Sequence, residues 1–419
     1  MFEIYKIQNQ HWENKLYDLP IKRKILETLK KELLNHKLII SIEGPRRVGK
    51  SVLMKQLINY LIENKVPSKN LFYFSFDKLD KKILDTLKDY EELSGISLRE
   101  EKTYLFFDEI QKIKDWQSDI KIIYDNYPNL KIIVSGSTLR VSKKESLAGR
   151  IVDFFINPLS FEEYLIFSGK EKLLDSEIDY IFEKEYNNYL FRQYPDIVLN
   201  KEIDSTQYIS LILQKVIFED SEKYIRNVDK DILYKICMII LRDPGQIINY
   251  SDLSKDLGVK REVVSKYIDF LVNSGVVKKV YNFSNNSRKL EIKSKKFYPY
   301  CTSLTRAVTD NPDMGKIIET DVCFQLDAKY FLNNKGKEEI DFLLIDPITS
   351  KKIGVEVKYR NLITNKDVSA FRSAIVKKLN LDKRIIIVKA ESKLDFNTKE
   401  IVPVMYFTIF KHQSEFKFK

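Results

Sequence analysis

Eight consecutive residues near the N-terminus have the types and spacing of a phosphate-binding loop. Residues 44–51 read G-x-x-x-x-G-K-S. In this pattern the glycines let backbone N–H groups close around phosphate oxygens, the lysine reaches the β- and γ-phosphates, and the serine hydroxyl binds Mg²⁺. We therefore predict an ATP site with bound Mg²⁺ here. Its predicted residues are Gly44, Pro45, Arg46, Arg47, Val48, Gly49, Lys50 and Ser51.

A second pair of residues could complete this site. The apolar run 103–107 ends in Asp108 and Glu109. Two adjacent acids at the end of a strand can divide the work of hydrolysis. We expect Asp108 to hold Mg²⁺ and Glu109 to polarise the attacking water.

Three further polar residues are candidates for contact with the γ-phosphate. Ser135 ends the apolar run 131–134 and could sense that phosphate. Arg150 is the candidate arginine finger, because a guanidinium suits the charge of the transition state. We expect it to act on a neighbouring subunit in a homo-oligomer, either a ring or a dimer. Arg140 is its competitor, and either arginine could instead be a surface cation.

The elements that must position these residues alternate between strand and helix. Strands are predicted near 38–43, 71–76, 103–108, 131–135 and 151–156, with helices between them. Such alternation predicts a parallel sheet that binds its ligand at the carboxyl ends of the strands.

Length, charge and composition limit the remaining possibilities. The chain has 419 residues and a formal charge of +11, which favours polyanion partners. No apolar run is long enough to span a membrane, and no signal peptide is evident, so we expect a cytoplasmic protein. Three scattered cysteines exclude a disulfide framework. The three histidines, among them His11, have no metal-ligand spacing and are expected at the surface.

Residues 247–280 have the pattern of a helix-turn-helix. A short helix capped by Ser251 is followed by a longer helix over 261–273. The stretches 276–280 and 290–293 alternate like two strands of a hairpin, so we predict a winged helix. Such a module could bind DNA or serve only for packing.

This segment is also the most basic of the chain. Between Lys255 and Lys296, 11 Lys and Arg residues stand against 4 Asp and Glu residues. Several of these cations are expected near DNA phosphates. They are Lys260, Arg261, Lys266, Lys289, Lys293, Lys295 and Lys296.

The last third of the chain holds a second set of carboxylates. Asp341 lies in one expected strand, and Glu356 and Lys358 lie on one face of the next. The two acids could share Mg²⁺, with Glu319 as a further ligand from a helix, and Lys358 could stabilise a phosphorane or activate water. The alternative is a structural cluster of ion pairs. A metal-binding fold of this kind could also bind DNA without cutting it.

Several short motifs together resemble the archaeal and bacterial AAA-type ATPases with a C-terminal restriction-endonuclease-like domain. The motifs are residues 44–51, 107–111, 135–137, 147–150, 158–164 and 356–358. The resemblance implies ATP binding and hydrolysis at Lys50, Ser51, Asp108 and Glu109. It also implies a nuclease-like core at Glu319, Asp341, Glu356 and Lys358.

We therefore expect an α/β chain in four parts. They are a P-loop ATPase core (1–160), a helical lid or connector (161–243), a winged helix (244–298) and a restriction-endonuclease-like domain (299–419). The leading hypothesis is an ATP-driven protein that processes duplex or branched DNA. One alternative is a nucleotide-switched regulator whose winged helix binds DNA and whose nuclease-like core is inactive. Another is a P-loop kinase, against which Asp108 and Glu109 argue.

Overall fold

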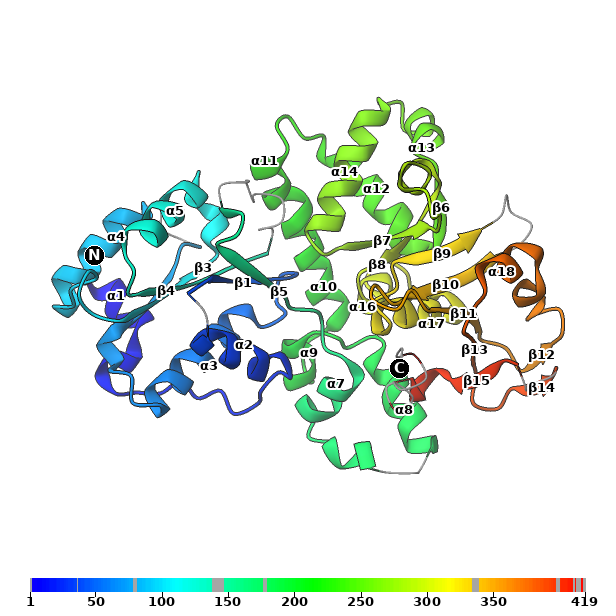
Figure 1. Cartoon of the computed structure of the whole chain (residues 1–419), viewed down its shortest axis with the longest axis horizontal. Coiled ribbons are helices and arrows are strands. Elements are labelled where there is room, and N and C mark those ends of the chain that lie inside the picture. The colour runs from blue at the N-terminus through cyan, green and yellow to red at the C-terminus, as the bar shows by residue number, and fades with distance from the viewer. Residues whose placement is uncertain are drawn as a thin grey trace. The chain divides into compact units, whose positions relative to one another are not determined.

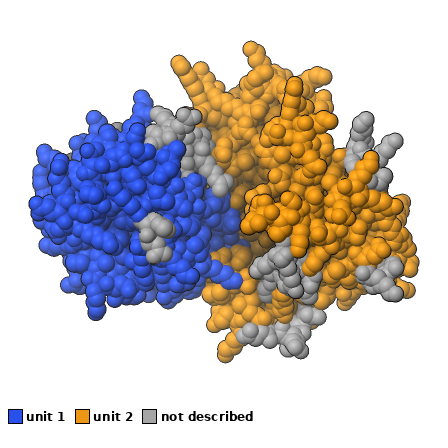
Figure 2. Space-filling view, in the orientation of Figure 1, with its two compact units in different colours: residues 1–159 blue, residues 160–419 orange. Residues whose placement is uncertain are grey.

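The computed structural model describes residues 2–35, 37–77, 81–137, 147–175, 179–333, 339–396 and 400–409, together with residues 411 and 416. The chain divides into two compact units, residues 1–159 and residues 160–419, which Figure 2 colours separately.

The first unit is built on a parallel sheet of five strands. The strands are β1 (Ile39–Glu43), β2 (Leu71–Ser75), β3 (Thr103–Asp108), β4 (Leu130–Gly136) and β5 (Ile151–Phe155). They lie in the order β2-β3-β4-β1-β5, and every neighbouring pair is parallel. All five predicted strands are confirmed to within one residue at either end. The carboxyl ends of β1, β3 and β4 therefore meet at one edge of the sheet.

Helices cover both faces of this sheet. They include α1 (Phe2–Gln8), α2 (Ile25–Asn35), α3 (Lys50–Glu63), α4 (Ile83–Ser94) and α5 (Trp116–Asn126). Figure 1 shows α2 and α3 on one face and α4 and α5 on the other. Phe72, Tyr90 and Trp116 are among the buried residues that pack α4 and α5 onto the sheet. This packing is what fixes the strand ends that carry the candidate site.

The expectation that the histidines lie at the surface is wrong for His11. This side chain is fully buried in the short 3₁₀ helix Gln10–Glu13. Its Nε2 lies 2.9 Å from the carbonyl oxygen of Leu71, and its Nδ1 lies 3.1 Å from the hydroxyl of Tyr17. Since a carbonyl can only accept, Nε2 carries the proton. His36 and His412 lie outside the described residues.

The second unit begins with a helical region. Its α-helices are α7 (Phe161–Phe167), α8 (Asp179–Tyr189), α9 (Pro195–Leu199), α10 (Ser205–Gln214), α11 (Ser221–Tyr224) and α12 (Lys230–Arg242). A capping box between Ser160 and Glu163 starts α7. The mainly helical character expected for residues 161–243 is confirmed for the described part of this range. The role of this region as a lid stays a prediction.

An eight-stranded sheet runs through the rest of the second unit. Its strands are β6 (Gln246–Ile248), β7 (Val277–Asn282), β8 (Lys295–Pro299), β9 (Tyr330–Asn333), β10 (Glu339–Ile345), β11 (Lys352–Lys358), β13 (Lys383–Val388) and β15 (Val402–Met405). Their order is β15-β13-β11-β10-β9-β7-β8-β6. The predicted boundary between the winged helix and the C-terminal domain follows residue 298. Parallel pairing of β7 with β9 connects strands on the two sides of this boundary.

The remaining elements of this unit surround that sheet. They are α13 (Tyr250–Asp256), α14 (Arg261–Asn273), α15 (Ser287–Ile292), α16 (Thr302–Arg306), α17 (Met314–Gln325), α18 (Ala374–Leu379) and the strand pair β12 (Leu362–Thr364) and β14 (Lys393–Asp395). The predicted longer helix over 261–273 is confirmed as α14, whose buried residues include Val264, Tyr267, Ile268 and Leu271.

Two local predictions in this region are wrong. Asn249, and not Ser251, caps α13, because its side chain accepts a hydrogen bond from the backbone N–H of Ser251. Residues 290–293 form no strand, since most of them belong to α15. The side chain of Asn286 caps that helix by accepting from the backbone N–H of Lys289 at 3.0 Å. Ile292 is 73% exposed, so the alternation of Leu290 and Ile292 marks no buried face.

Two features of composition can be compared with the fold. Cys237, Cys301 and Cys323 are buried free thiols, which agrees with the expected lack of a disulfide framework. Within the described ranges, no helix combines the length and the apolar character needed to cross a membrane.

Candidate functional sites

The phosphate-binding loop starts at a glycine that no other residue can replace without displacement of the backbone. Gly44 has φ of +145°, and a Cβ atom at this position would lie 2.2 Å from the carbonyl oxygen of Ile156. The backbone N–H of Ile156 donates to the carbonyl oxygen of Glu43 at 2.6 Å. The first glycine of the motif is thus required by the close approach of the chain after β5.

Lys50 and Arg23 both donate hydrogen bonds to backbone carbonyl oxygens of the phosphate-binding loop. The Nζ of Lys50 is buried and donates to the carbonyl oxygens of Gly44 at 3.0 Å and Pro45 at 2.7 Å. Arg23 donates to the carbonyl oxygens of Val48 at 2.8 Å and Asn157 at 2.9 Å. Sequence reasoning missed Arg23, because nothing in its surroundings marks it as a partner of the loop.

The carboxylate of Asp108, at the end of β3, contacts side chains from the neighbouring strands β2 and β4 and from helix α3, which follows the loop. Its Oδ2 accepts from the hydroxyls of Ser51 at 2.5 Å and Tyr73 at 2.7 Å. Its Oδ1 accepts from the hydroxyl of Ser135. The structure therefore brings together Ser51, Asp108 and Ser135, as the sequence predicted. Tyr73 was missed, since its position depends on β2 lying beside β3.

Glu109 follows Asp108 in a left-handed backbone conformation, with φ of +53°. Its side chain accepts a hydrogen bond from the amide of Gln111. The same amide lies 3.5 Å from the hydroxyl of Ser137, just beyond β4. Glu109 is thus held at the same edge of the sheet as Asp108 and Ser135.

Arg150 lies at the amino ends of the strands of the first sheet, opposite the carboxyl ends that carry the phosphate-binding loop and Asp108. Its carbonyl oxygen accepts from the backbone N–H of Ile39, at the start of β1. Its guanidinium makes two hydrogen bonds with the carboxylate of Asp125, at 3.0 and 3.2 Å. Arg150 is therefore remote from the phosphate-binding loop that follows β1. Its role as an arginine finger toward another subunit stays a prediction, and its competitor Arg140 lies outside the described residues.

The second candidate site lies on β10 and β11. These strands are antiparallel neighbours, with Phe342 opposite Val355. This register brings Asp341 close to Glu356 and Lys358. The Nζ of Lys358 lies 2.6 Å from Oε2 of Glu356 and 3.6 Å from Oδ2 of Asp341. The same Oδ2 accepts from the backbone N–H of Val357 at 2.8 Å.

The predicted place of Lys296 near DNA phosphates is wrong, since its side chain is buried in this second site. Its Nζ lies 2.5 Å from Glu339, 3.4 Å from Glu319 and 3.7 Å from Asp341. Tyr298, two residues further along β8, donates to Glu319 at 2.6 Å. Strand alternation directs both side chains to the same face. We call these seven residues the carboxylate cluster: Lys296, Tyr298, Glu319, Glu339, Asp341, Glu356 and Lys358.

Burial and mutual contact change the acidities in the carboxylate cluster. Burial and the nearby Asp341 carboxylate raise the pKa of Glu356 well above its usual value. Burial and Asp341 also raise the pKa of Glu319, although Lys296 and Tyr298 act against them. Burial would raise the pKa of Asp341 too, but Lys358 and Lys296 outweigh it and the pKa is lowered. Of Glu319, Asp341 and Glu356, only Asp341 has a pKa shifted in favour of the anion.

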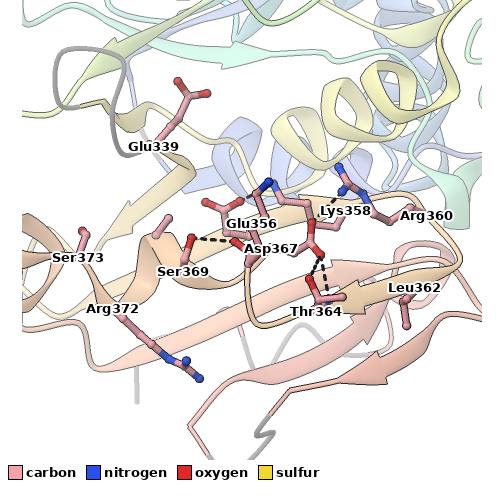
Figure 3. Close-up of a pocket in the computed structure, with 12 residues that line it drawn as sticks. Glu339, Glu356, Lys358, Arg360, Leu362, Thr364, Asp367, Ser369, Arg372 and Ser373 are labelled. Atoms are coloured by element: carbon pink, nitrogen blue, oxygen red, sulfur yellow. Dashed lines mark hydrogen bonds and ion pairs between the residues drawn. The ribbon is translucent and has the colours of Figure 1, made fainter.

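A cavity of about 770 Å³ opens beside this cluster. Figure 3 shows Glu356 and Lys358 next to each other in its wall, with Glu339 nearby. Further cations in the wall are Arg360, Lys366 and Arg372, and Arg360 pairs with Asp367 at 2.8 Å. Among the described residues, no three His, Cys, Asp or Glu side chains are grouped so as to hold one metal ion. The metal role of Glu319, Asp341 and Glu356 stays a prediction.

Three family models match parts of the chain. Residues 36–165 match the AAA domain. Residues 183–314 match a domain of unknown function (DUF8612), and residues 317–407 match another (DUF4143). The first match contains the phosphate-binding loop, Asp108, Glu109 and Arg150.

Similar proteins extend over most of the chain. The uncharacterized protein MJ1637 of Methanocaldococcus jannaschii is 29% identical, and the alignment covers 82% of this chain and 80% of that protein. An uncharacterized protein of Haemophilus influenzae is 26% identical, over 72% of this chain and 78% of its own length. Among solved structures, the Walker-type ATPase PABY2304 of Pyrococcus abyssi has a TM-score of 0.43 and 15% identity, covering 71% of this chain and 99% of that one.

The parallel sheet, the loop after β1 and the acids at the end of β3 occur together within the segment that matches the AAA domain. Residues 36–165 therefore form an AAA-type P-loop ATPase domain, and two regions that match domains of unknown function follow it.

Proposed function

We propose that the first unit binds and hydrolyses ATP with Mg²⁺, and that the second unit binds duplex or branched DNA. The protein would then be an ATP-driven DNA-processing enzyme that moves or remodels DNA. The observation that carries the ATPase part is the convergence of Ser51, Asp108 and Ser135 at the edge of the sheet where the phosphate-binding loop begins.

The residues at this edge fit a magnesium–nucleotide complex. A serine hydroxyl and a carboxylate are ligands that Mg²⁺ prefers, and Ser51 and Asp108 already lie within hydrogen-bonding distance of each other. Mg²⁺ bound there would neutralise charge on the phosphate oxygens. Lys50 would exchange its contacts with the carbonyls of Gly44 and Pro45 for contacts with phosphate.

Glu109 is the residue to which we assign the activation of water. It is held beside Asp108 but in a separate backbone conformation, so the two carboxylates need not serve the same ion. A glutamate in this position can accept a hydrogen bond from the attacking water and orient it.

The DNA-binding part rests on charge and exposure in the second unit. Four cations of α14 and the segment before it are exposed: Lys255, Lys260, Arg261 and Lys266. Arg288 and Lys289 of α15 are exposed as well. The cavity at β11 adds Arg360, Lys366 and Arg372. Lysine and arginine side chains bind the phosphate backbone independently of sequence.

The proposal is tested by the ATPase rate of the purified protein with and without DNA. Duplex, forked and four-way DNA should each be tried at low salt, with the Lys50→Ala variant as a control for contaminating ATPases. We expect turnover by the unaltered protein, stimulation by at least one DNA form and none in the variant. Turnover with neither DNA stimulation nor DNA binding would leave an ATPase and remove the DNA-processing part.

A second candidate function is favoured by the two lysines in the carboxylate cluster. A nucleotide-switched regulator would bind DNA through the helical part of the second unit and would not cut it. Slow turnover, tight retention of ADP and sequence-specific binding would identify such a regulator. Cleavage of DNA in the presence of Mg²⁺ or Mn²⁺, lost on Asp341→Ala, would exclude it.

A further inference from the structure

Three carboxylates converge on the ammonium group of Lys296. Its Nζ is within 4 Å of Glu319 on α17 and of Glu339 and Asp341 on β10. An ammonium group has three donors, and three carboxylates surround it. The side chain is only 5% exposed, so water contributes little to its solvation.

Each carboxylate oxygen of Asp341 faces a lysine. Its Oδ1 faces Lys296 at 3.7 Å, and its Oδ2 faces Lys358 at 3.6 Å. A divalent ion that bound either oxygen would come within a few ångströms of an ammonium group and would be repelled. Asp341 is also the carboxylate that the two lysines of the cluster share.

We infer that Lys296 takes the place of a divalent cation in the carboxylate cluster. It ties β8 to α17 and β10, and it prevents the cluster from binding metal while its side chain stays in this position. Tyr298 strengthens the same connection through its hydrogen bond to Glu319. The structure therefore assigns Glu319, Glu339 and Asp341 to the binding of an internal ammonium group.

The inference is tested by metal binding to nucleotide-free protein. Binding of Mn²⁺ is measured by electron paramagnetic resonance for the unaltered protein and for Lys296→Met, which keeps the length of the side chain and removes its charge. We expect no Mn²⁺ at the cluster of the unaltered protein. We expect one ion in the variant, bound at least about tenfold more tightly than any ion in the unaltered protein. Thermal unfolding of the variant should shift upward on addition of Mn²⁺.

Lys295→Met is the matched control. Lys295 is the preceding residue of β8, and its Nζ donates to the carbonyl oxygens of Glu291 and Lys293. This variant should bind no more Mn²⁺ than the unaltered protein. A gain of binding equal to that of Lys296→Met would overturn the inference, because removal of any nearby charge would then suffice.

The unaltered protein decides the question even if Lys296→Met does not fold. Mn²⁺ binding that is lost on Glu319→Gln or Asp341→Asn would show that the cluster holds metal beside Lys296, and would overturn the inference. A folded Lys296→Met that binds no Mn²⁺ would overturn it as well. The measurement needs neither ATP nor DNA, so its failure leaves the proposed ATPase and DNA-binding activities untouched.

Discussion

The hydroxyl of Ser51 donates to Oδ2 of Asp108 at 2.5 Å, across the space between the phosphate-binding loop and the end of β3. These residues are 57 positions apart in the chain, and the sequence predicts both as ligands of one Mg²⁺ ion. Tyr73 donates to the same oxygen, and Ser135 donates to the other. The carboxylate of Asp108 is therefore oriented by three hydroxyl groups before any ligand binds.

Asp108→Asn should reduce ATP turnover by at least about a hundredfold, because the amide cannot replace a carboxylate as a ligand of Mg²⁺. Tyr73→Phe is the control, since it removes one hydrogen bond to Asp108 and leaves the charge. It should lower turnover much less. The check is the steady-state ATPase rate as a function of Mg²⁺ concentration. Equal losses in both variants would mean that the orientation of Asp108, and not its charge, governs the rate.

Glu109→Gln should keep ATP binding and lose hydrolysis by about a hundredfold to ten-thousandfold, the range of a positioned general base. Calorimetry for binding and a single-turnover assay for hydrolysis separate the two steps. Gln111→Ala removes the hydrogen-bond donor to Glu109 and should have a smaller effect on the rate. Loss of ATP binding in Glu109→Gln would assign this residue to the nucleotide and not to the water.

Gly44→Ala should destabilise the first unit by about 1–3 kcal/mol through its backbone conformation alone. The clash of the new Cβ with the carbonyl oxygen of Ile156 adds to this loss. Gly95→Ala is the control. Gly95 ends α4 with φ of +75°, but a Cβ there meets nothing within 4 Å, so the expected loss is about 1 kcal/mol. Urea unfolding and ATP binding are the measurements, and Gly44→Ala with normal values for both would contradict the role assigned to this glycine.

The first unit should lose stability as the pH falls from about 6.5 toward about 4. Burial lowers the pKa of His11 from 6.5 to about 4, although the hydrogen bond to Leu71 acts against it. Between these values the unfolded chain binds a proton that the folded chain does not. His11 therefore makes its full contribution to the free energy of unfolding above pH 6.5. Acidification to about pH 4 removes about 3 kcal/mol of this free energy.

The comparison that isolates this effect is the unaltered protein against His11→Gln. Glutamine keeps an N–H that can reach the carbonyl of Leu71 but does not titrate. The free energy of unfolding of the variant should depend less on pH between 6.5 and 4. Parallel curves for the two proteins would show that His11 is protonated without cost in the folded state.

Arg261→Glu and Lys266→Glu should weaken DNA binding, and each should reduce the dependence of log K on log salt by about 0.9 for the lost phosphate contact. Both residues are exposed on α14. Lys201→Glu is the matched control, because Lys201 is also exposed in the second unit but lies before α10. If all three variants bind equally well at every salt concentration, DNA does not contact α14.

The parts of this molecule that sequence could predict are those set by neighbours in the chain. The strands of the first sheet were located because each is a short apolar run between polar turns, and Asp108 because it ends such a run. Tyr73, Arg23 and Lys296 escaped for the opposite reason. Each of these residues makes its hydrogen bonds or ion pairs with residues that are distant in the chain and are brought near by the order of the strands or by the path of a loop. The residues on either side of it form no recognisable motif.

The errors have equally local causes. Residues 290–293 alternate in polarity, but Asn286 caps a helix there, and a capped turn outweighs a short alternation in which Ile292 stays exposed. His11 is expected at the surface because the histidines show no metal-ligand spacing. Its ring is instead retained inside by a carbonyl and a tyrosine hydroxyl.

The parallel pairing of β7 with β9 has a consequence for any attempt to divide the chain. A break after residue 298 would separate partners of a single sheet, and each fragment would present a row of unsatisfied backbone groups to its surroundings. Such fragments should precipitate when made alone and dissolve when made together. Recovery of soluble protein when both fragments are expressed in one host cell would then report on the strength of the pairing between β7 and β9.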